Sequence, residues 1–368
     1  MSATPRIRRH SGRRGSHDRA VTEFPLRLSF LPSPTIAPPL APRITAEPVR
    51  RAHEAVTVAP AGAGVLVTGS HRSGTTWVGQ ILGLAPGLCY LHEPFKPCWD
   101  PPYVWTLWNR YFLHVDDHNE AEYEQAVART LSLCYDPVRV LKCGLTPRRV
   151  VRAADQWARW TYRRLRGRRP LVKDPIALFS APWLYRRFGL DVVMMIRHPA
   201  AFVSSIKVKG WWFNFNHFLR QDRLMSELLY PFEHEIRALA AKNDDLVEQA
   251  ILQWRCFHHV IYRYQQRYPS WQFVRHEDLS LDPLTGFRDM FAALDLRFTP
   301  ACERAVLESS DGNNLKDAAV AGKSTRFCKL NSAANAQNWR DRLTSDEIRR
   351  IRDETADIAQ HFYDDAEW

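Results

Sequence analysis

Long apolar runs, paired cysteines and lysine are all scarce in this sequence. No apolar stretch reaches the roughly 18 residues that a membrane-spanning helix needs, so the sequence predicts none. The seven Cys include no C-x-x-C pair, which argues against a disulfide framework and against a structural zinc site. We therefore expect mostly buried, reduced thiols in an intracellular, cytoplasmic protein, while a zinc site built from distant residues stays open.

Lysine is the rarer of the two strong bases. The chain has 51 Lys and Arg, of which only nine are Lys, against 40 Asp and Glu, so its net charge is +11. Arg binds planar oxyanions through a bidentate fork, so an anionic ligand is one explanation, and a GC-rich genome is the other. No reader motif and no basic stripe with interleaved aromatic residues is found, so we expect no binding to nucleic acid.

The length of 368 residues predicts one domain of catalytic size with an appendage. Residues 1–60 contain nine of the 24 Pro and ten Arg, but no Lys, Trp or Cys. Such a segment cannot bury enough apolar surface to offset the entropy of ordering it, so we expect it to be disordered. A targeting peptide, a tail and a start codon placed too early remain open for it. Residues 61–368 are then the catalytic domain.

Short apolar runs alternate with helical patterns from residue 62 onward. Each run ends in a cluster of polar residues, and this order predicts an α/β fold with a parallel sheet and ligands at the carboxyl ends of its strands. The apolar runs are 65–67, 171–172, 192–196 and 271–274, and helical segments include 148–166, 178–188, 216–229 and 246–268.

The segment GSHRSGTT, from Gly69 to Thr76, fits the phosphate-loop frame G-x-x-x-x-G-x-[ST]. Thr75 occupies the position of the usual loop Lys, and Arg72 supplies a cation inside the loop instead. Glycines let successive amides turn toward an anion, and the following helix adds its dipole. A purely structural turn is the alternative interpretation.

The apolar run at 192–196 ends in Arg197, where a nucleoside triphosphatase usually has an Asp that holds Mg²⁺. Ser205 lies in the helix that follows, so Arg197 and Ser205 could bind one phosphate together. This pattern predicts group transfer without a metal. Sulfuryl transfer fits it, because the transferring group carries less negative charge than a phosphoryl group.

Four segments carry a resemblance to a known family. TGSHRSGTTWVGQIL resembles the 5′-phosphosulfate-binding motif of sulfotransferases that use 3′-phosphoadenosine 5′-phosphosulfate (PAPS), and IRHPAAFVSS resembles their 3′-phosphate-binding motif. HEDLSLDP and NWRDRLT resemble two later segments of the family. The resemblance runs from about residue 64 to 345. It implies a phosphate-loop-type parallel sheet flanked by helices on both faces, and an enzyme closer to the bacterial and carbohydrate type than to cytosolic phenol and steroid enzymes.

The resemblance also implies roles for individual residues. Trp77 would pack on the adenine, and Arg197 and Ser205 would hold the 3′-phosphate. The late Arg-Lys-Gly of cytosolic members is not found, and the candidates to replace it are Gly322–Lys323, Arg326 or Lys329. The residues implied for the 5′-phosphosulfate are Arg72, Ser73, Gly74, Thr75 and Thr76.

An acceptor hydroxyl must lose a proton as sulfur is attacked, and a positioned base does this. Glu93, in LHEPF, is our first candidate because carbohydrate sulfotransferases often have a Glu-Pro there. Asp174, in VKDP, is the second candidate and His92 the third; Glu93 could also be a capping or ion-paired carboxylate. Lys173 matches a family Lys that contacts the sulfate, and a structural ion pair with Asp174 is its alternative. Pro175 stands where cytosolic members have their catalytic His.

The acceptor is expected to be a hydroxyl of a glycan or glycolipid. Aromatic side chains could line its cleft by stacking on sugar rings, or they could be core residues: Trp99, Trp105, Trp108, Trp211, Trp212, Phe213 and Phe215. His258 and His259 are expected to be core or surface residues and not ligands. A phosphate-loop kinase and a non-catalytic nucleotide-binding protein are the alternative functions, and a kinase would require Mg²⁺.

Overall fold

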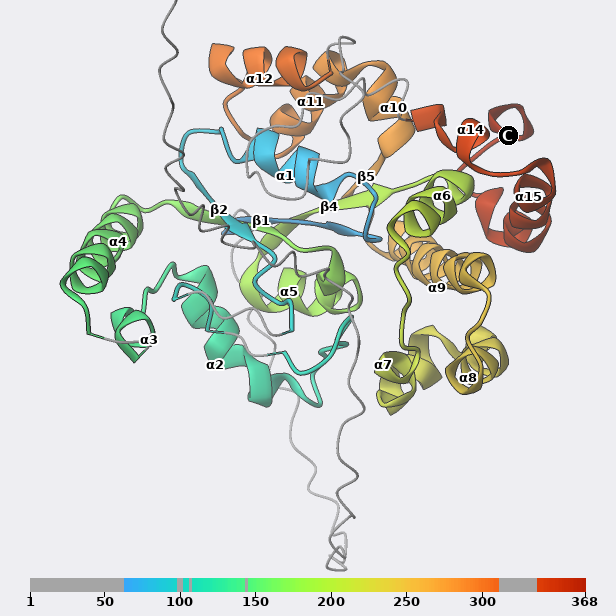
Figure 1. Ribbon diagram of the computed structural model, residues 1–368. Helices are drawn as coiled ribbons and strands as arrows, with labels where there is room; N and C mark the ends of the chain where they lie inside the picture. The colour runs from blue at the N-terminus through green and yellow to red at the C-terminus, as the bar shows by residue number, and fades with distance from the viewer. Residues whose placement is uncertain (1–62, 98–101, 106–107, 143–144, 311–335) are drawn as a thin grey trace, which may run out of the picture. The chain divides into compact units, whose positions relative to one another are not determined.

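The computed structural model describes residues 63–97, 102–105, 108–142, 145–310 and 336–368. Within these residues, five parallel strands form one sheet in the order β2-β3-β1-β4-β5 (Figure 1). Their bounds are Gly64–Gly69 for β1, Leu88–His92 for β2, Arg169–Lys173 for β3, Leu190–Ile196 for β4 and Gln272–Arg275 for β5.

Both faces of the sheet are covered, because its central strands carry apolar side chains toward both faces. Side chains alternate between the two faces of a strand. Val65 and Val67 of β1 therefore pack in one apolar cluster, and Leu66 packs in the other. All six residues of β1 are buried, as expected for a central strand of a parallel sheet.

The helices divide between these two clusters. One face is covered by α1 (Thr75–Leu82), α11 (Pro283–Ala293) and α12 (Pro300–Ser310), which lie above the sheet in Figure 1. The other cluster includes α5 (Ala181–Phe188), α6 (Pro199–Lys209), α9 (Leu246–Arg267) and α15 (Ser345–Ala359). The sheet is thus the middle layer between two layers of helices.

The remaining helices lie in the connections. After β2 come α2 (Glu120–Leu131), α3 (Pro137–Lys142) and α4 (Pro147–Leu165), and a 3₁₀ turn (Pro175–Ser180) follows β3. α7 (Asn216–Leu219), a π turn (Leu224–Leu228), a 3₁₀ turn (Tyr230–Phe232) and α8 (Glu233–Ala241) connect α6 to α9, while α10 (His276–Leu281) follows β5. The chain ends in α14 (Trp339–Arg342), α15 and a 3₁₀ turn (Asp365–Glu367). In the part of the chain described, no helix combines the length and the apolar character needed to cross a bilayer.

The order of the strands determines where a ligand would bind. β1 lies between β3 and β4. After β1 the chain forms β2 and β3 on one side of this strand, and it then forms β4 and β5 on the opposite side. In open α/β sheets, ligands bind outside the carboxyl ends of the strands at such a switch point. The residues after β1, β3 and β4 therefore meet at the edge where the candidate site should lie.

The α/β fold with helices on both faces is confirmed. The four expected apolar runs coincide with β1, β3, β4 and β5, and the pattern at 246–268 is α9. The expected helix 216–229 is wrong as a single element, because α7 ends at Leu219 and a π turn follows at Leu224–Leu228. The expected disorder of residues 1–60 and the late-loop candidates between 322 and 329 lie outside the described residues.

Candidate functional site

The loop between β1 and α1 curls back on itself at the carboxyl end of β1. The Ser73 backbone N–H and hydroxyl both donate to the carbonyl of Ser70, at 3.3 and 2.5 Å. Gly74 has a φ of 90°, in the left-handed region, and a Cβ there would lie 2.4 Å from Cδ2 of His276. Only glycine fits this position without strain, since both the backbone conformation and the close approach exclude a side chain.

Two helix N-termini follow the two motifs at this edge of the sheet. α1 begins at Thr75, directly after the loop, and α6 begins at Pro199, directly after Arg197 and His198. Neither of these two helices, both fully described, has an acidic residue in its first turn or a side-chain hydrogen bond at its N-cap. Their first-turn amides and positive dipole ends therefore suit an anion.

Arg72 joins the two motifs. Its Nε donates to Oγ of Ser205 at 2.8 Å, although the residues are 133 positions apart. Its guanidinium also lies 5.5 Å from the ring centroid of Trp211. Desolvation and then the positive charge of Arg197 lower the pKa of Arg72, although the residue as a whole is exposed. The residues predicted for the 5′-phosphosulfate and for the 3′-phosphate are thus neighbours. Ser205, which was predicted to bind the 3′-phosphate with Arg197, accepts a hydrogen bond from Arg72 in this structure.

Arg197 is held at the end of β4 through its backbone. Its N–H donates to Nε2 of His258 at 3.3 Å, and its carbonyl accepts from the indole N–H of Trp254 at 2.8 Å. Nδ1 of His258 lies 2.9 Å from the carbonyl of Trp254, so this nitrogen carries the proton. Burial lowers the pKa of His258 to about 3, which keeps it neutral. His258 is therefore a core residue of α9, as expected.

Glu277 positions Arg197 and its neighbour. One carboxylate oxygen lies 3.4 Å from Nε of Arg197 and accepts from the backbone N–H of His198 at 3.1 Å. The other accepts from the hydroxyl of Tyr363 at 2.9 Å. Glu277 belongs to the segment HEDLSLDP, whose resemblance to the family was visible in the sequence. The contact of Glu277 with Arg197 was not predicted.

The C-terminal elements also reach this part of the site. The ring of His198 stacks on Trp339, with centroids 5.1 Å apart, and it makes edge contacts with Tyr363 and Trp368. Burial, and then the charge of Arg197, lower the pKa of His198 to about 3. The NWRDRLT segment therefore packs beside the predicted 3′-phosphate-binding residues.

Lys173 and Glu93 form an ion pair at the carboxyl ends of β2 and β3. Nζ of Lys173 lies 2.6 Å from Oε1 of Glu93, and the Glu93 N–H donates to the Lys173 carbonyl at 2.8 Å. The Lys173 side chain is 1% exposed, and its stem crosses Gly79 of α1, where a Cβ would lie 2.8 Å from Cγ of Lys173. This packing fixes the ammonium at the edge of the sheet.

Glu93 is a half-buried carboxylate in a positive surrounding. Burial alone would raise its pKa, but the charge and hydrogen bond of Lys173, then His92 and Lys96, lower the pKa below its ordinary value. His92, by contrast, has its pKa lowered by burial and by Lys173, and its Nδ1 lies 3.0 Å from the Tyr90 hydroxyl. Glu93 is therefore ionised at neutral pH and 23% exposed, which leaves it accessible.

Asp174 is fully buried and both of its oxygens are engaged. Oδ2 accepts from the N–H of Phe95 at 2.7 Å, and Oδ1 caps the following 3₁₀ turn by accepting from Ile176 at 3.1 Å. Burial and then the charge of Glu93 raise the pKa of Asp174 to about 7. Asp174 thus fixes the segment that carries Glu93, and Lys173 pairs with Glu93.

The aromatic candidates separate into packed and exposed side chains. Trp77 packs against Phe287 at 5.1 Å, and its indole N–H donates to Ser309 at 2.9 Å. Trp211 and Trp212, directly after α6, are exposed by 39% and 48%. The core residues among the candidates are Trp108, which stacks on Phe95, and Phe215; Trp105 is partly buried, and Trp99 lies outside the described residues.

His71 was not singled out from the sequence, although it lies within the loop. Its ring contacts Phe202, Phe257, Phe112 and Trp211, with centroid separations between 5.1 and 6.3 Å. Burial and then the charge of Arg72 lower its pKa to about 3. It is thus a neutral ring that anchors the loop on an aromatic cluster.

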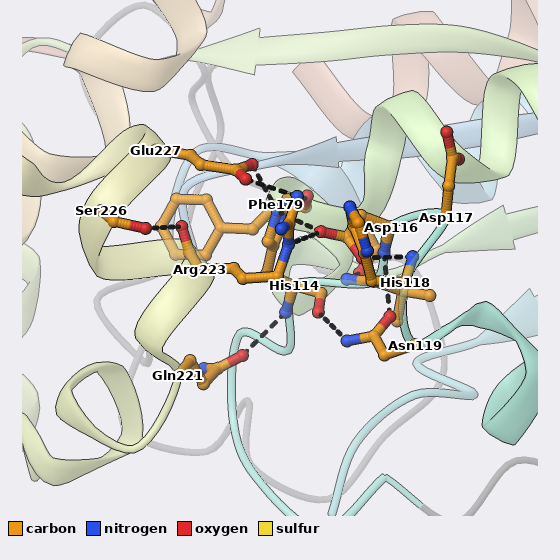
Figure 2. Close-up of polar contacts among 12 residues, drawn as sticks. His114, Asp116, Asp117, His118, Asn119, Phe179, Gln221, Arg223, Ser226 and Glu227 are labelled. Atoms are coloured by element: carbon orange, nitrogen blue, oxygen red, sulfur yellow. Dashed lines mark hydrogen bonds and ion pairs between the residues drawn. The ribbon is translucent and has the colours of Figure 1, made fainter. Parts of the chain in front are cut away.

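In the described part of the chain, one group of side chains has the ligand types of a metal site: His114, Asp116 and Glu227 (Figure 2). Arg223 pairs with both carboxylates, with 2.5 Å between its Nη2 and Oε1 of Glu227. Gln221 binds the N–H of His114 at 2.9 Å. Since Arg223 already supplies positive charge, this group functions as an ion-pair network that ties residues 112–119 to 221–227.

Comparison with known proteins agrees with this geometry. Residues 64–300 match the family model described as the sulfotransferase family. The chain belongs to the sulfotransferase family. The matched residues run from the start of β1 to the start of α12, so they include every strand of the sheet and both anion motifs.

Two carbohydrate sulfotransferases are similar to this family member in sequence. Carbohydrate sulfotransferase 5 of Mus musculus is 25% identical over 337 residues, which are 81% of this chain and 80% of the relative. Carbohydrate sulfotransferase 1 of Danio rerio is 26% identical over 202 residues, which are 53% of this chain but only 41% of that relative.

Solved sulfotransferase structures were also matched. The sulfotransferase domain of the Synechococcus PCC 7002 olefin synthase is 18% identical, with 82% of this chain and 94% of that chain covered and a TM-score of 0.41. Mouse sulfotransferase SULT7A1, solved in complex with PAP, is 10% identical, with 85% and 89% covered and a TM-score of 0.40.

Proposed function

We propose that this sulfotransferase moves the sulfuryl group of PAPS to a hydroxyl of a carbohydrate acceptor, with Glu93 as the base. The observation that carries the proposal is the ion pair between Lys173 and Glu93, 2.6 Å apart at the same sheet edge as the two anion motifs. It supplies a fixed ammonium for a sulfate and an ionised carboxylate for a proton. A carbohydrate acceptor is supported by the 25% identity to mouse carbohydrate sulfotransferase 5.

The residues at the edge of the sheet suit the donor. PAPS carries phosphate groups at both the 5′ and 3′ positions. The site has two acid-free helix N-termini, and an arginine precedes each of them, Arg72 before α1 and Arg197 before α6. Backbone amides at helix N-termini and Arg forks are established ligands for phosphate. We assign Arg72 and the loop residues Ser73 to Thr76 to the 5′-phosphosulfate, where Arg72 would also stabilise charge on the leaving phosphate, and Arg197 with Ser205 to the 3′-phosphate. Ser205 would exchange its contact with Arg72 for the donor.

The proposed reaction transfers one sulfuryl group in a single displacement. The acceptor oxygen forms a bond to sulfur while the bond from sulfur to the 5′-phosphate oxygen breaks, which leaves adenosine 3′,5′-bisphosphate. A carboxylate oxygen of Glu93 takes the hydroxyl proton, and the Nζ ammonium of Lys173 stabilises charge on the sulfuryl oxygens. No divalent metal enters this scheme, because arginines and helix amides supply the positive charge.

Glu93 is preferred to Asp174 as the base for a geometric reason. Asp174 is fully buried and both of its oxygens accept backbone N–H groups, so an acceptor hydroxyl could not reach it without displacing the segment that holds Glu93. A raised pKa of about 7 also leaves Asp174 partly protonated at neutral pH. Glu93 is ionised, partly exposed and fixed by Lys173.

Incubation with sulfur-labelled PAPS, excess chelator and a panel of sugar, phenol and steroid acceptors tests the proposal. We expect label on a carbohydrate hydroxyl, identified by the mass of the product, at a rate that the chelator does not change. Transfer from ATP that requires Mg²⁺ would instead identify a kinase. Transfer to a phenol alone would reject the carbohydrate acceptor and keep the donor.

A further inference from the structure

Helix α4 contacts the rest of the protein through a narrow strip. Of its 19 residues only Ala153 and Trp160 are buried. The Trp160 ring stacks on Tyr103 with centroids 4.6 Å apart, and Arg163 reaches Sγ of Cys89 in the edge strand β2 at 4.0 Å. The helix therefore lies beside the edge of the sheet, with most of its surface in solvent (Figure 1).

The outward surface of α4 is apolar along one side. Val151, Tyr162 and Leu165 are exposed by 69%, 60% and 81%, and Val150 and Trp157 are exposed as well. At 3.6 residues per turn these five side chains fall within a sector of roughly 140°. Ala154, Ala158 and Thr161 lie in the same sector. We call this sector the α4 face.

Arginines flank the α4 face. The helix contains six Arg and one Asp but no Lys or Glu, so its net charge is 6 − 1 = +5. Helical spacing places Arg148, Arg152 and Arg159 along one border of the face and Arg164 along the other. Asp155 neutralises only Arg159, at 2.9 Å. An apolar strip bordered by arginines is the arrangement of helices that lie in a bilayer surface.

A cavity of about 330 Å³ opens beside the face. Two arginines and three aromatic side chains surround it, which is a suitable lining for an anionic headgroup with apolar chains below it. The residues that line it include Trp105, Arg129, Tyr135, Trp157, Thr161 and Arg164.

We propose that the α4 face docks the protein on a membrane surface rich in anionic lipid. Charge decides between the candidate occupants. A second copy related by a two-fold axis would bring two surfaces of charge +5 together, which is unfavourable. An anionic bilayer matches both the apolar strip and its arginine borders. Length agrees too, since 19 residues form a rod of about 28 Å that can lie along the surface.

Vesicle co-sedimentation of the full chain tests this proposal. We expect binding to vesicles of phosphatidylcholine with phosphatidylglycerol, little binding to phosphatidylcholine alone, and weakening as salt is added. Val151→Glu combined with Leu165→Glu should lower the partition coefficient at least tenfold. Arg148→Gln combined with Arg152→Gln should lower it about fivefold per arginine.

Matched controls separate the α4 face from general effects. Leu281→Glu combined with Leu307→Glu changes two leucines that are exposed by 70% and 50% on α10 and α12, and it should leave binding unchanged. All the substituted side chains are exposed, so the melting temperature should not move. Wild-type binding by the α4 variants would overturn the proposal and point to another surface, such as the arginine-rich residues 1–60. A dimer in light scattering that the α4 variants dissociate would overturn it in favour of a second copy.

Discussion

Replacing Glu93 with Gln is the most informative perturbation of this site. Gln keeps the shape of Glu and can still accept a hydrogen bond from Nζ of Lys173, which lies 2.6 Å from Oε1 in the native protein. It removes the negative charge and the basicity. If Glu93 is the base, turnover should fall by about 10²–10⁴-fold, while the affinity for adenosine 3′,5′-bisphosphate stays nearly unchanged.

The burial of Lys173 sets the accompanying change in stability. Its side chain is 1% exposed, so removing its partner leaves a buried charge without compensation. Removing one partner of a buried ion pair costs about 3–5 kcal/mol, and Glu93→Ala should approach that range. Gln retains the hydrogen bond and should cost about 1–3 kcal/mol. Denaturant unfolding of the two variants therefore separates a loss of catalysis from a loss of folding.

The pH dependence of kcat/KM distinguishes Glu93 from Asp174. The pKa of Glu93 is lowered below 4.5, whereas that of Asp174 is raised to about 7. A base must be deprotonated, so with a sugar acceptor the rate should be flat from about pH 5 to 8 if Glu93 acts. A rate that climbs through pH 7 would support Asp174 instead.

Glu354→Gln is the matched control, because Glu354 is also an ion-paired carboxylate, 2.7 Å from Nε of Arg350, but lies on α15. It should keep full activity. Retention of more than about a tenth of the wild-type rate by Glu93→Gln falls short of the loss expected for a general base and would refute the assignment.

Three further predictions concern binding and stability. Arg197→Ala should weaken calorimetric binding of adenosine 3′,5′-bisphosphate by about 2–5 kcal/mol without affecting adenosine 5′-monophosphate; equal losses would remove its 3′ role. Gly74→Ala should cost at least about 1 kcal/mol in denaturant unfolding, because φ is 90° and His276 lies in the way. Deleting residues 1–60 should change neither the melting temperature nor donor affinity, and a large drop in either would contradict their expected disorder.

The sheet could be predicted because its central strands are continuous apolar runs that end in polar clusters. β2 was missed, since LCYLH is short and its edge position leaves His92 exposed. The predicted helix 216–229 was wrong for a different reason. Its apolar residues fit a helical period, but side-chain contacts of Gln221 with the 112–114 segment hold the chain in another path. The local hydrophobic pattern contains no information about contacts with residues so far away in the sequence.

The site was predictable where local sequence determines geometry. The loop glycines and the strand-end Arg197 mark their positions, and the switch point of a parallel sheet brings them together. The partner of Lys173 was not predictable in this way, because the alternative of pairing with the adjacent Asp174 is equally compatible with the sequence. The structure pairs Lys173 with Glu93, 80 residues away, through the register of β2 with β3. Glu277 was likewise invisible as the partner of Arg197, since their contact depends on β4 pairing with β5.

The ion pair between Lys173 and Glu93 also affects how well Glu93 can act as a base. Lys173 lowers the pKa of Glu93, which makes Glu93 a weak base in the free protein. Negative charge from a bound sulfuryl donor near Nζ would offset the ammonium, so the pKa of Glu93 should rise when the donor binds. The carboxylate would then become basic only when there is a group to transfer. Since kcat reports the complex and kcat/KM the free enzyme, the acid limb of kcat should lie at higher pH than that of kcat/KM. Coincident limbs would show that Lys173 remains with Glu93 during the reaction and does not stabilise the sulfuryl group.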